Sequence, residues 1–288
     1  MARKLPLIAG RAGRRTNLSL VEGVDTYVEL LGAPIDRLHQ EEAVMAIEAF
    51  VSARAPRQVA TVNLDFLRIA RRNEAFAQTL RQADLALADG MPLVWASRLA
   101  GAALPQRIAG IDLVEALCDR GSSLGWSIFL LGAEPGIGIA ASVAMLRRHP
   151  GLRIGGVYSP PVGHWDDLEE KRIRDRITEA NPDILLVALG APRQDIWIAE
   201  NKHRLGVPVS IGVGGTFDVV CGARLRAPRW LQRIGMEWAF RLASEPRRLW
   251  RRYMSDLPTF SRLMLSALRS RFSRGPVARP SIVRGGAR

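Results

Sequence analysis

Cysteine, histidine and long apolar runs are scarce in this sequence, and each scarcity narrows the class of protein. The 288 residues include two cysteines and four histidines. Cys118 and Cys221 lie far apart, which favours two reduced thiols in a reducing compartment over a disulfide framework. Because no run of about 18 apolar residues occurs, we expect no transmembrane helix. No secretory signal is recognisable either, so any membrane role is expected to be peripheral.

Acidic residues are also few compared with basic ones. The chain has 41 Lys and Arg against 28 Asp and Glu, a net charge of +13. Most of this excess lies in residues 223–274, which hold thirteen arginines and three acidic residues. Such a segment needs an anionic partner or a solvent-exposed face. Phosphate groups, anionic lipid and nucleic acid are the candidates.

Short apolar runs, by contrast, alternate regularly with amphipathic segments. Hydrophobic residues make up 48% of the chain, enough for a sizeable core. Strands are predicted at 26–31, 58–62, 85–88, 126–131, 153–158, 184–189 and 207–213. Helices are predicted at 41–53, 65–82, 110–118, 137–148, 168–180 and 194–204. Continuous apolar strands that alternate with helices predict an α/β, Rossmann-like fold, with a mostly parallel sheet covered on both faces.

The composition also suggests a division of the chain. We expect a basic, flexible N-terminus (1–22), the Rossmann-like core (23–222), a helical appendage rich in Arg and Trp (223–274) and a disordered tail (275–288).

Small and polar residues follow six of the predicted strands. In parallel sheets, ligands bind beyond the carboxyl ends of the strands, where glycine lets backbone amides approach them closely. The six loops lie at 61–63, 89–92, 132–136, 159–161, 190–194 and 212–216. Each is also explained by ordinary turn chemistry, but six on one predicted edge favour a binding cleft.

One of these loops loosely resembles a dinucleotide-binding fingerprint. Gly132 to Gly138 has the spacing G-x-x-x-G-x-G instead of G-x-G-x-x-G, and no acidic residue follows at the ribose position. The loop therefore indicates a nucleotide or phosphate near a helix N-terminus. An NAD(P)-dependent oxidoreductase is the alternative function on this evidence.

A more specific resemblance rests on an ordered set of motifs. They are Thr61-Val62-Asn63, Ala83-Asp84 through Asp89-Gly90 to Val94, Arg107 to Leu113, Leu130 to Ala133, Gly156 to Pro161, Gly190 to Ile198, Gly212 to Asp218, Arg226 to Pro228, and Glu237 to Arg248. Across residues 25–253 the sequence resembles the WecG/TagA/CpsF family, glycosyltransferase family 26. A single motif of this kind is weak evidence for a family, whereas the whole set in this order is highly specific to this one.

The resemblance implies an activity and partners. It implies an inverting, metal-independent transfer of a hexose-type sugar (N-acetylmannosamine, its uronic acid or a glucose-like sugar) from a UDP-sugar to a polyprenyl-diphosphate-linked acceptor. This would serve cell-surface polysaccharide biosynthesis at the inner face of the cytoplasmic membrane, with no cofactor. The sequence is consistent with a metal-independent transfer, since it contains no Asp-x-Asp motif and its histidines are scattered.

The resemblance also assigns site residues. An acceptor hydroxyl must lose its proton as it attacks, and Asp89 is the implied base; the alternative is an aspartate that forms a turn before Gly90. Thr61, Asn63 and Gln194 are the other implied catalytic residues, and they are expected to position the sugars. The implied substrate-binding residues are Arg107, Gly110, Asp112, Gly132, Tyr158, Gly190, Arg241, Arg248 and Arg251. Arg252 competes with Arg251 for contact with the leaving diphosphate, which arginine suits.

The appendage carries aromatic residues at helical spacing. Trp230, Ile234 and Trp238 fall at i, i+4 and i+8, and Pro246 is placed to start a new helix. Aromatics next to arginines suit an anionic membrane surface, although the same stripe is explained by packing on the core. A nucleic-acid-binding role leaves the cleft loops unexplained, so no nucleic acid is expected.

Overall fold

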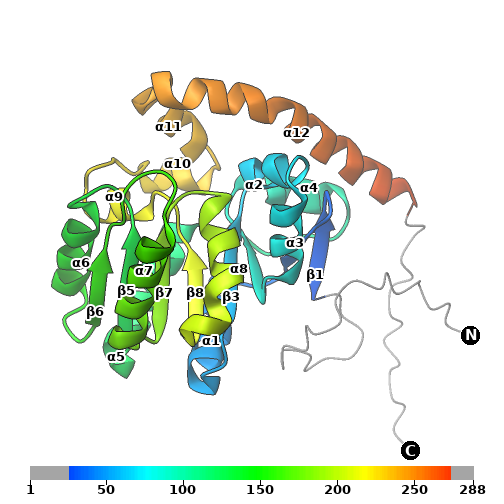
Figure 1. Ribbon diagram of the computed structural model, residues 1–288. Coiled ribbons are helices and arrows are strands. Elements are labelled where there is room, and N and C mark those ends of the chain that lie inside the picture. The colour runs from blue at the N-terminus through cyan, green and yellow to red at the C-terminus, as the bar shows by residue number, and fades with distance from the viewer. Residues whose placement is uncertain (1–25, 274–288) are drawn as a thin grey trace, which may run out of the picture.

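A six-stranded parallel sheet forms the centre of the protein (Figure 1), whose computed structural model describes residues 26–273. The strands are β3 (Arg57–Val62), β4 (Leu85–Ala88), β5 (Ser127–Gly132), β6 (Arg153–Tyr158), β7 (Ile184–Ala188) and β8 (Val209–Gly212). Their order is β4-β3-β8-β7-β5-β6. Every residue of β4, β7 and β8 is buried, as expected for strands covered on both faces. The predicted Rossmann-like architecture is confirmed.

Alternate residues of each strand pack against helices on opposite faces. Ile128 and Leu130 of β5 join a core with α1 (Gln40–Ala53), α5 (Gly110–Leu124), α6 (Ile137–Arg148) and α9 (Thr216–Val220). Phe129 and Leu131 pack on α7 (Asp167–Ala180) and α8 (Arg193–Leu205). The helices predicted in these places begin and end close to the predicted residues, except that α5 continues to Leu124. It ends there because Gly125 takes the left-handed conformation (φ 69°).

Two predictions in the first hundred residues were wrong or incomplete. Residues 65–82 form two helices, α2 (Leu64–Ala70) and α3 (Glu74–Gln82), and not one. The Asn73 side chain accepts a hydrogen bond from the Phe76 amide (3.0 Å) and caps a new helix. Residues after Gly90, predicted as a loop, form α4 (Met91–Leu99).

A small hairpin accompanies the main sheet. The predicted first strand is β1 (Tyr27–Leu30), which pairs antiparallel with an unpredicted strand, β2 (Ala33–Asp36). The chain reverses at Leu31 and Gly32, both at positive φ. A carboxylate oxygen of Asp36 accepts the Ala86 amide (2.7 Å) and thereby joins the hairpin to β4.

The C-terminal helices lie together on one side of the sheet. They are α10 (Arg229–Arg233), α11 (Glu237–Ser244) and α12 (Pro246–Ser273), and α12 crosses α2 and α4 (Figure 1). Leu249, Leu263 and Ala267 are the buried apolar residues of α12, and the predicted helix start at Pro246 is confirmed.

The aromatic stripe of this segment is divided and exposed. Gly235, at φ 78°, separates α10 from α11, so Trp230, Ile234 and Trp238 do not lie on one helix. Their side chains are 62%, 59% and 43% exposed, which contradicts packing on the core. Within residues 26–273, no helix is both long and apolar enough to cross a bilayer. The predictions for 1–22 and 275–288 lie outside the described residues.

Candidate active site

The ends of β3, β4 and β8 converge on Gly110, the first residue of α5. A methyl group on Gly110 would lie 3.6 Å from Thr216 Oγ1, 3.7 Å from Thr61 Oγ1 and 3.8 Å from Asp89 Oδ2. Asp89 directly follows β4, and its amide donates to the Val62 carbonyl (2.7 Å). A carboxylate and two hydroxyls therefore surround a position where the absence of a side chain leaves space.

A second group of polar contacts connects these strand ends to the end of β7. Thr61 Oγ1 donates to the Gly212 carbonyl (3.1 Å) at the end of β8. Gln194 Oε1 accepts the amides of Gly190 (3.1 Å) and Gly214 (3.0 Å), which belong to the loops after β7 and β8. The buried Gln194 side chain thus fixes two of the loops predicted to form the cleft.

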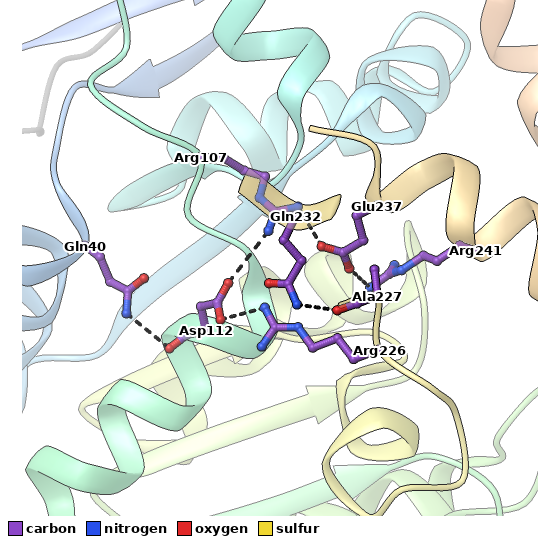
Figure 2. Close-up of polar contacts among 8 residues, drawn as sticks. All are labelled: Gln40, Arg107, Asp112, Arg226, Ala227, Gln232, Glu237 and Arg241. Atoms are coloured by element: carbon purple, nitrogen blue, oxygen red, sulfur yellow. Dashed lines mark hydrogen bonds and ion pairs between the residues drawn. The ribbon is translucent and has the colours of Figure 1, made fainter. Parts of the chain in front are cut away.

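Charged residues from the core and the C-terminal helices form one network (Figure 2), and Arg107, Glu237 and Arg241 of this network act on the charge of Asp89. Arg107 lies 2.7 Å from the buried Glu237 of α11, and Glu237 also pairs with Arg241 (2.8 Å). Asp112, in the first turn of α5, pairs with Arg226 (2.6 Å) and lies 3.8 Å from Arg107. This network joins the start of α5 to the segment that leads into α10 and α11.

The network sets the electrostatic environment of Asp89. Burial raises the pKa of the Asp89 carboxyl, and the Glu237 charge adds to that rise. Arg241, Arg107 and the Gly110 amide act in the opposite direction, but the net shift is upward. The pKa of Glu237 is instead lowered: burial alone would raise it, but Arg241 and Arg107 outweigh burial. A carboxyl with a raised pKa beside two cations has the properties of a general base.

Three predicted residues make contacts that have a structural explanation. The Asn63 side chain accepts the Phe66 amide (3.2 Å) and caps α2. Tyr158 donates to Glu169 (2.6 Å), and the Arg176 guanidinium lies 4.7 Å from its ring centre. A side chain at Gly132 would lie 2.6 Å from the Ala188 carbonyl, so close strand packing requires glycine there. Their substrate-binding roles stay predictions.

The arginines of α12 differ in their partners. Arg248 pairs with Glu245, and Arg252 pairs with Asp65 (3.2 Å). Arg251 is exposed and makes no ion pair within residues 26–273. Of the two neighbours, Arg251 is thus the one without an ion-pair partner in the described residues, and its contact with a diphosphate stays a prediction.

Sequence reasoning did not select three residues of the cluster: Thr216, Arg226 and Glu237. Each stands inside a motif that carries the resemblance, which was the available signal. Glu237 is also one of three acidic residues in the basic segment, where a buried carboxylate has many possible partners. Within the described part of the chain, no group of three or more His, Cys, Asp or Glu residues is arranged to hold a metal ion.

A parallel α/β sheet with a carboxylate and arginines at its carboxyl edge carries the groups that a transfer from an anionic donor would use. The model of the glycosyl transferase WecG/TagA/CpsF family matches residues 28–274. The chain belongs to this family and is a glycosyltransferase. Nothing in the comparisons supports the oxidoreductase alternative.

Curated relatives agree with this assignment. One, from Bacillus spizizenii, is 36% identical over 68% of this chain and 74% of its own length. Another, from Staphylococcus aureus strain MRSA252, is 28% identical over 81% of this chain and 90% of its own length. Both carry the name N-acetylglucosaminyldiphosphoundecaprenol N-acetyl-beta-D-mannosaminyltransferase.

Proposed function

We propose that this enzyme transfers N-acetylmannosamine, or a closely related hexosyl group, from a UDP-sugar to an N-acetylglucosaminyl diphosphate carried on a polyprenol. The acceptor and the sugar follow the names of the relatives from Bacillus and Staphylococcus. A uridine nucleotide as donor follows from the family resemblance, and we place its phosphates near the glycine-containing loops after β5 and β7.

The observation that carries this proposal is the position of Asp89. Its carboxylate lies at the end of β4 beside Thr61, Thr216 and the open side of Gly110, with Arg107 and Arg241 acting on its charge. A side chain with this environment is suited to hold the proton of an attacking hydroxyl.

In the proposed reaction, the acceptor oxygen forms a bond to the anomeric carbon as the bond to the UDP phosphate breaks. Attack from the opposite face inverts that carbon, so an α-linked donor gives a β-linked product. The hydroxyl proton passes to Asp89, and UDP leaves with the bonding electron pair. Arg241 and Arg251 supply the positive charge that stabilises the diphosphate as it departs.

We further propose that the enzyme binds to the membrane surface through its C-terminal helices. A polyprenyl-linked acceptor is confined to that surface. The exposed aromatic residues of α10 to α12, interspersed with arginines, suit contact with anionic headgroups.

A panel of UDP-sugars tests the proposal. The purified full chain is incubated with each donor and with a short-chain N-acetylglucosaminyl diphosphate lipid, and products are identified by mass spectrometry. UDP-N-acetylmannosamine is expected to give a disaccharide lipid and an equal amount of UDP. Absence of any glycosylated lipid with the whole panel would refute the proposal.

A further inference from the structure

A basic pocket opens beside the charged network, outside the group of residues around Gly110. Its volume is about 610 Å³, and it lies between α4, the chain before α5, and α10. Its charged lining residues are Arg98, Arg107, Asp112, Arg226, Arg229 and Arg233. The volume falls within the range of about 300–1,000 Å³ that is typical of small-molecule sites.

The positive charge of this pocket is only partly neutralised. Arg107 and Arg226 are paired, with Glu237 (2.7 Å) and Asp112 (2.6 Å). Arg98, Arg229 and Arg233 are exposed and form no ion pair with any residue between 26 and 273. Three guanidinium groups without an ion-pair partner around one cavity suit a polyanion such as a diphosphate.

We propose that this pocket binds the diphosphate of the lipid-linked acceptor. The proposal rests on the proposed function and assigns a place to one of its two substrates. Arg229 and Arg233, one turn apart on α10, are the residues that would bind the phosphates. Arg98 of α4 lines the same cavity.

The shared residue Arg107 connects the pocket with the reacting centre. Arg107 lines the pocket, and its charge also acts on Asp89, so the pocket and the proposed base are neighbours. In an acceptor with one sugar on its diphosphate, a single ring separates the phosphates from the hydroxyl that attacks. Phosphates held beside Arg107 therefore place that ring next to Asp89.

The surroundings of the pocket favour the lipid-linked substrate over the nucleotide. Exposed Trp230 (62%) of α10 and Ile234 (59%), the residue that follows this helix, alternate with Arg229 and Arg233. Trp95 of α4, which is 37% exposed, lies against the turn at Gly235 that follows α10. A cationic site with an exposed apolar rim matches a diphosphate attached to a polyprenyl chain. The loops after β5 and β7, proposed for the nucleotide, contribute nothing to its lining.

Kinetics of the Arg229→Ala/Arg233→Ala double variant test the assignment. The acceptor is a short-chain N-acetylglucosaminyl diphosphate lipid in detergent, so attraction to a bilayer does not contribute. We expect the acceptor KM to rise by about tenfold or more, because two charge-assisted contacts are lost. The donor KM and the thermal protection by UDP should stay unchanged. Arg229→Lys/Arg233→Lys should recover part of the loss.

The matched control is Arg262→Ala/Arg269→Ala, which removes two exposed arginines of α12 that do not line the pocket. It should leave the acceptor KM unchanged. A rise in the donor KM alone would assign the pocket to the nucleotide. No change in either constant, or an equal rise in the control, would overturn the proposal.

Binding of farnesyl diphosphate, measured by calorimetry in detergent, separates this proposal from the proposed function. It requires no turnover, so it reports on the pocket even if no UDP-sugar is a substrate. Weaker binding to the double variant than to the wild type is expected, and equal binding would exclude the site.

Discussion

The guanidinium of Arg107 donates to the carboxylate of Glu237 across 2.7 Å, although the two residues are 130 positions apart. Glu237 also holds Arg241, so one buried carboxylate orients two cations that act on Asp89. Breaking a buried pair leaves an uncompensated charge, which is costly. The pair thus fixes the C-terminal helices to the core and adjusts the charge at the proposed base.

Glu237→Gln is expected to move the acid limb of the kcat/KM profile to lower pH. Asp89 must be ionised to accept a proton, and removing the Glu237 charge lowers the pKa of Asp89. Arg241→Gln should move the same limb to higher pH, because Arg241 holds that pKa down. The pH dependence of transfer with both substrates below KM measures both shifts.

Glu245→Gln is the control for this pair of variants, since Glu245 lies in the same segment and pairs with Arg248. It should leave the limb in place. Shifts of the same sign in Glu237→Gln and Arg241→Gln would contradict the electrostatic account of Asp89.

The Asp112–Arg226 pair is expected to contribute to docking of the C-terminal segment. Both side chains are partly exposed (33% and 24%), so solvent screening limits their coupling to about 1 kcal/mol. A double-mutant cycle of Asp112→Ala and Arg226→Ala, followed by denaturant unfolding, measures that energy. Strictly additive effects would mean that the 2.6 Å contact contributes nothing.

The sequence was sufficient to predict the parallel sheet because its strands are continuous apolar runs such as Ile184–Ala188. Prediction from the sequence failed where a single residue interrupts a helical pattern. Asn73 caps α3 within a stretch whose periodicity continues, and Gly235 divides the aromatic stripe of α10 and α11. Periodicity records which face is apolar and does not record a break in the backbone.

The site was predictable only where its residues follow strands or stand in recognisable motifs. Asp89, Thr61 and Gly110 were found, and they lie together. The pairing of Arg107 with Glu237 was not predictable, because thirteen arginines offer many partners and no local spacing connects residues so far apart. Gln194 was identified, but its contacts with two loops become visible only once β7 and β8 are neighbours.

Asp195 is expected to make stability fall as pH rises. Its side chain is fully buried, neither oxygen has a hydrogen-bond partner in the described residues, and burial raises its pKa from 3.8 to about 7. Between those values the folded state binds the proton more tightly, so stability is lost as pH rises towards 7 and stays low above it. The shift corresponds to about 4 kcal/mol.

Thermal unfolding at about pH 5 and about pH 8 tests this linkage. Asp195→Asn should show a smaller decrease in Tm between the two conditions than the wild type. Asp119→Asn, a change at an exposed side chain, serves as the control. An equal decrease in Asp195→Asn and the wild type would show that Asp195 does not titrate as described.

The exposed tryptophans of the C-terminal helices are expected to contact anionic vesicles. Trp230→Ala and Trp250→Ala, at side chains 62% and 54% exposed, should each weaken vesicle binding by about fivefold or more. Added salt should weaken it further, because each nearby arginine contributes about 1 kcal/mol. Sedimentation with vesicles measures the affinity. Equal binding to neutral and anionic vesicles would contradict the role of the arginines.

The most direct test of the account is the turnover of Asp89→Asn with a UDP-sugar and the lipid-linked acceptor. Asparagine keeps the shape of the side chain and cannot take the proton, so kcat should fall by about 10²- to 10⁴-fold. The KM values for both substrates and the Tm should change little. Turnover within a few-fold of the wild type would contradict the claim that Asp89 is the base.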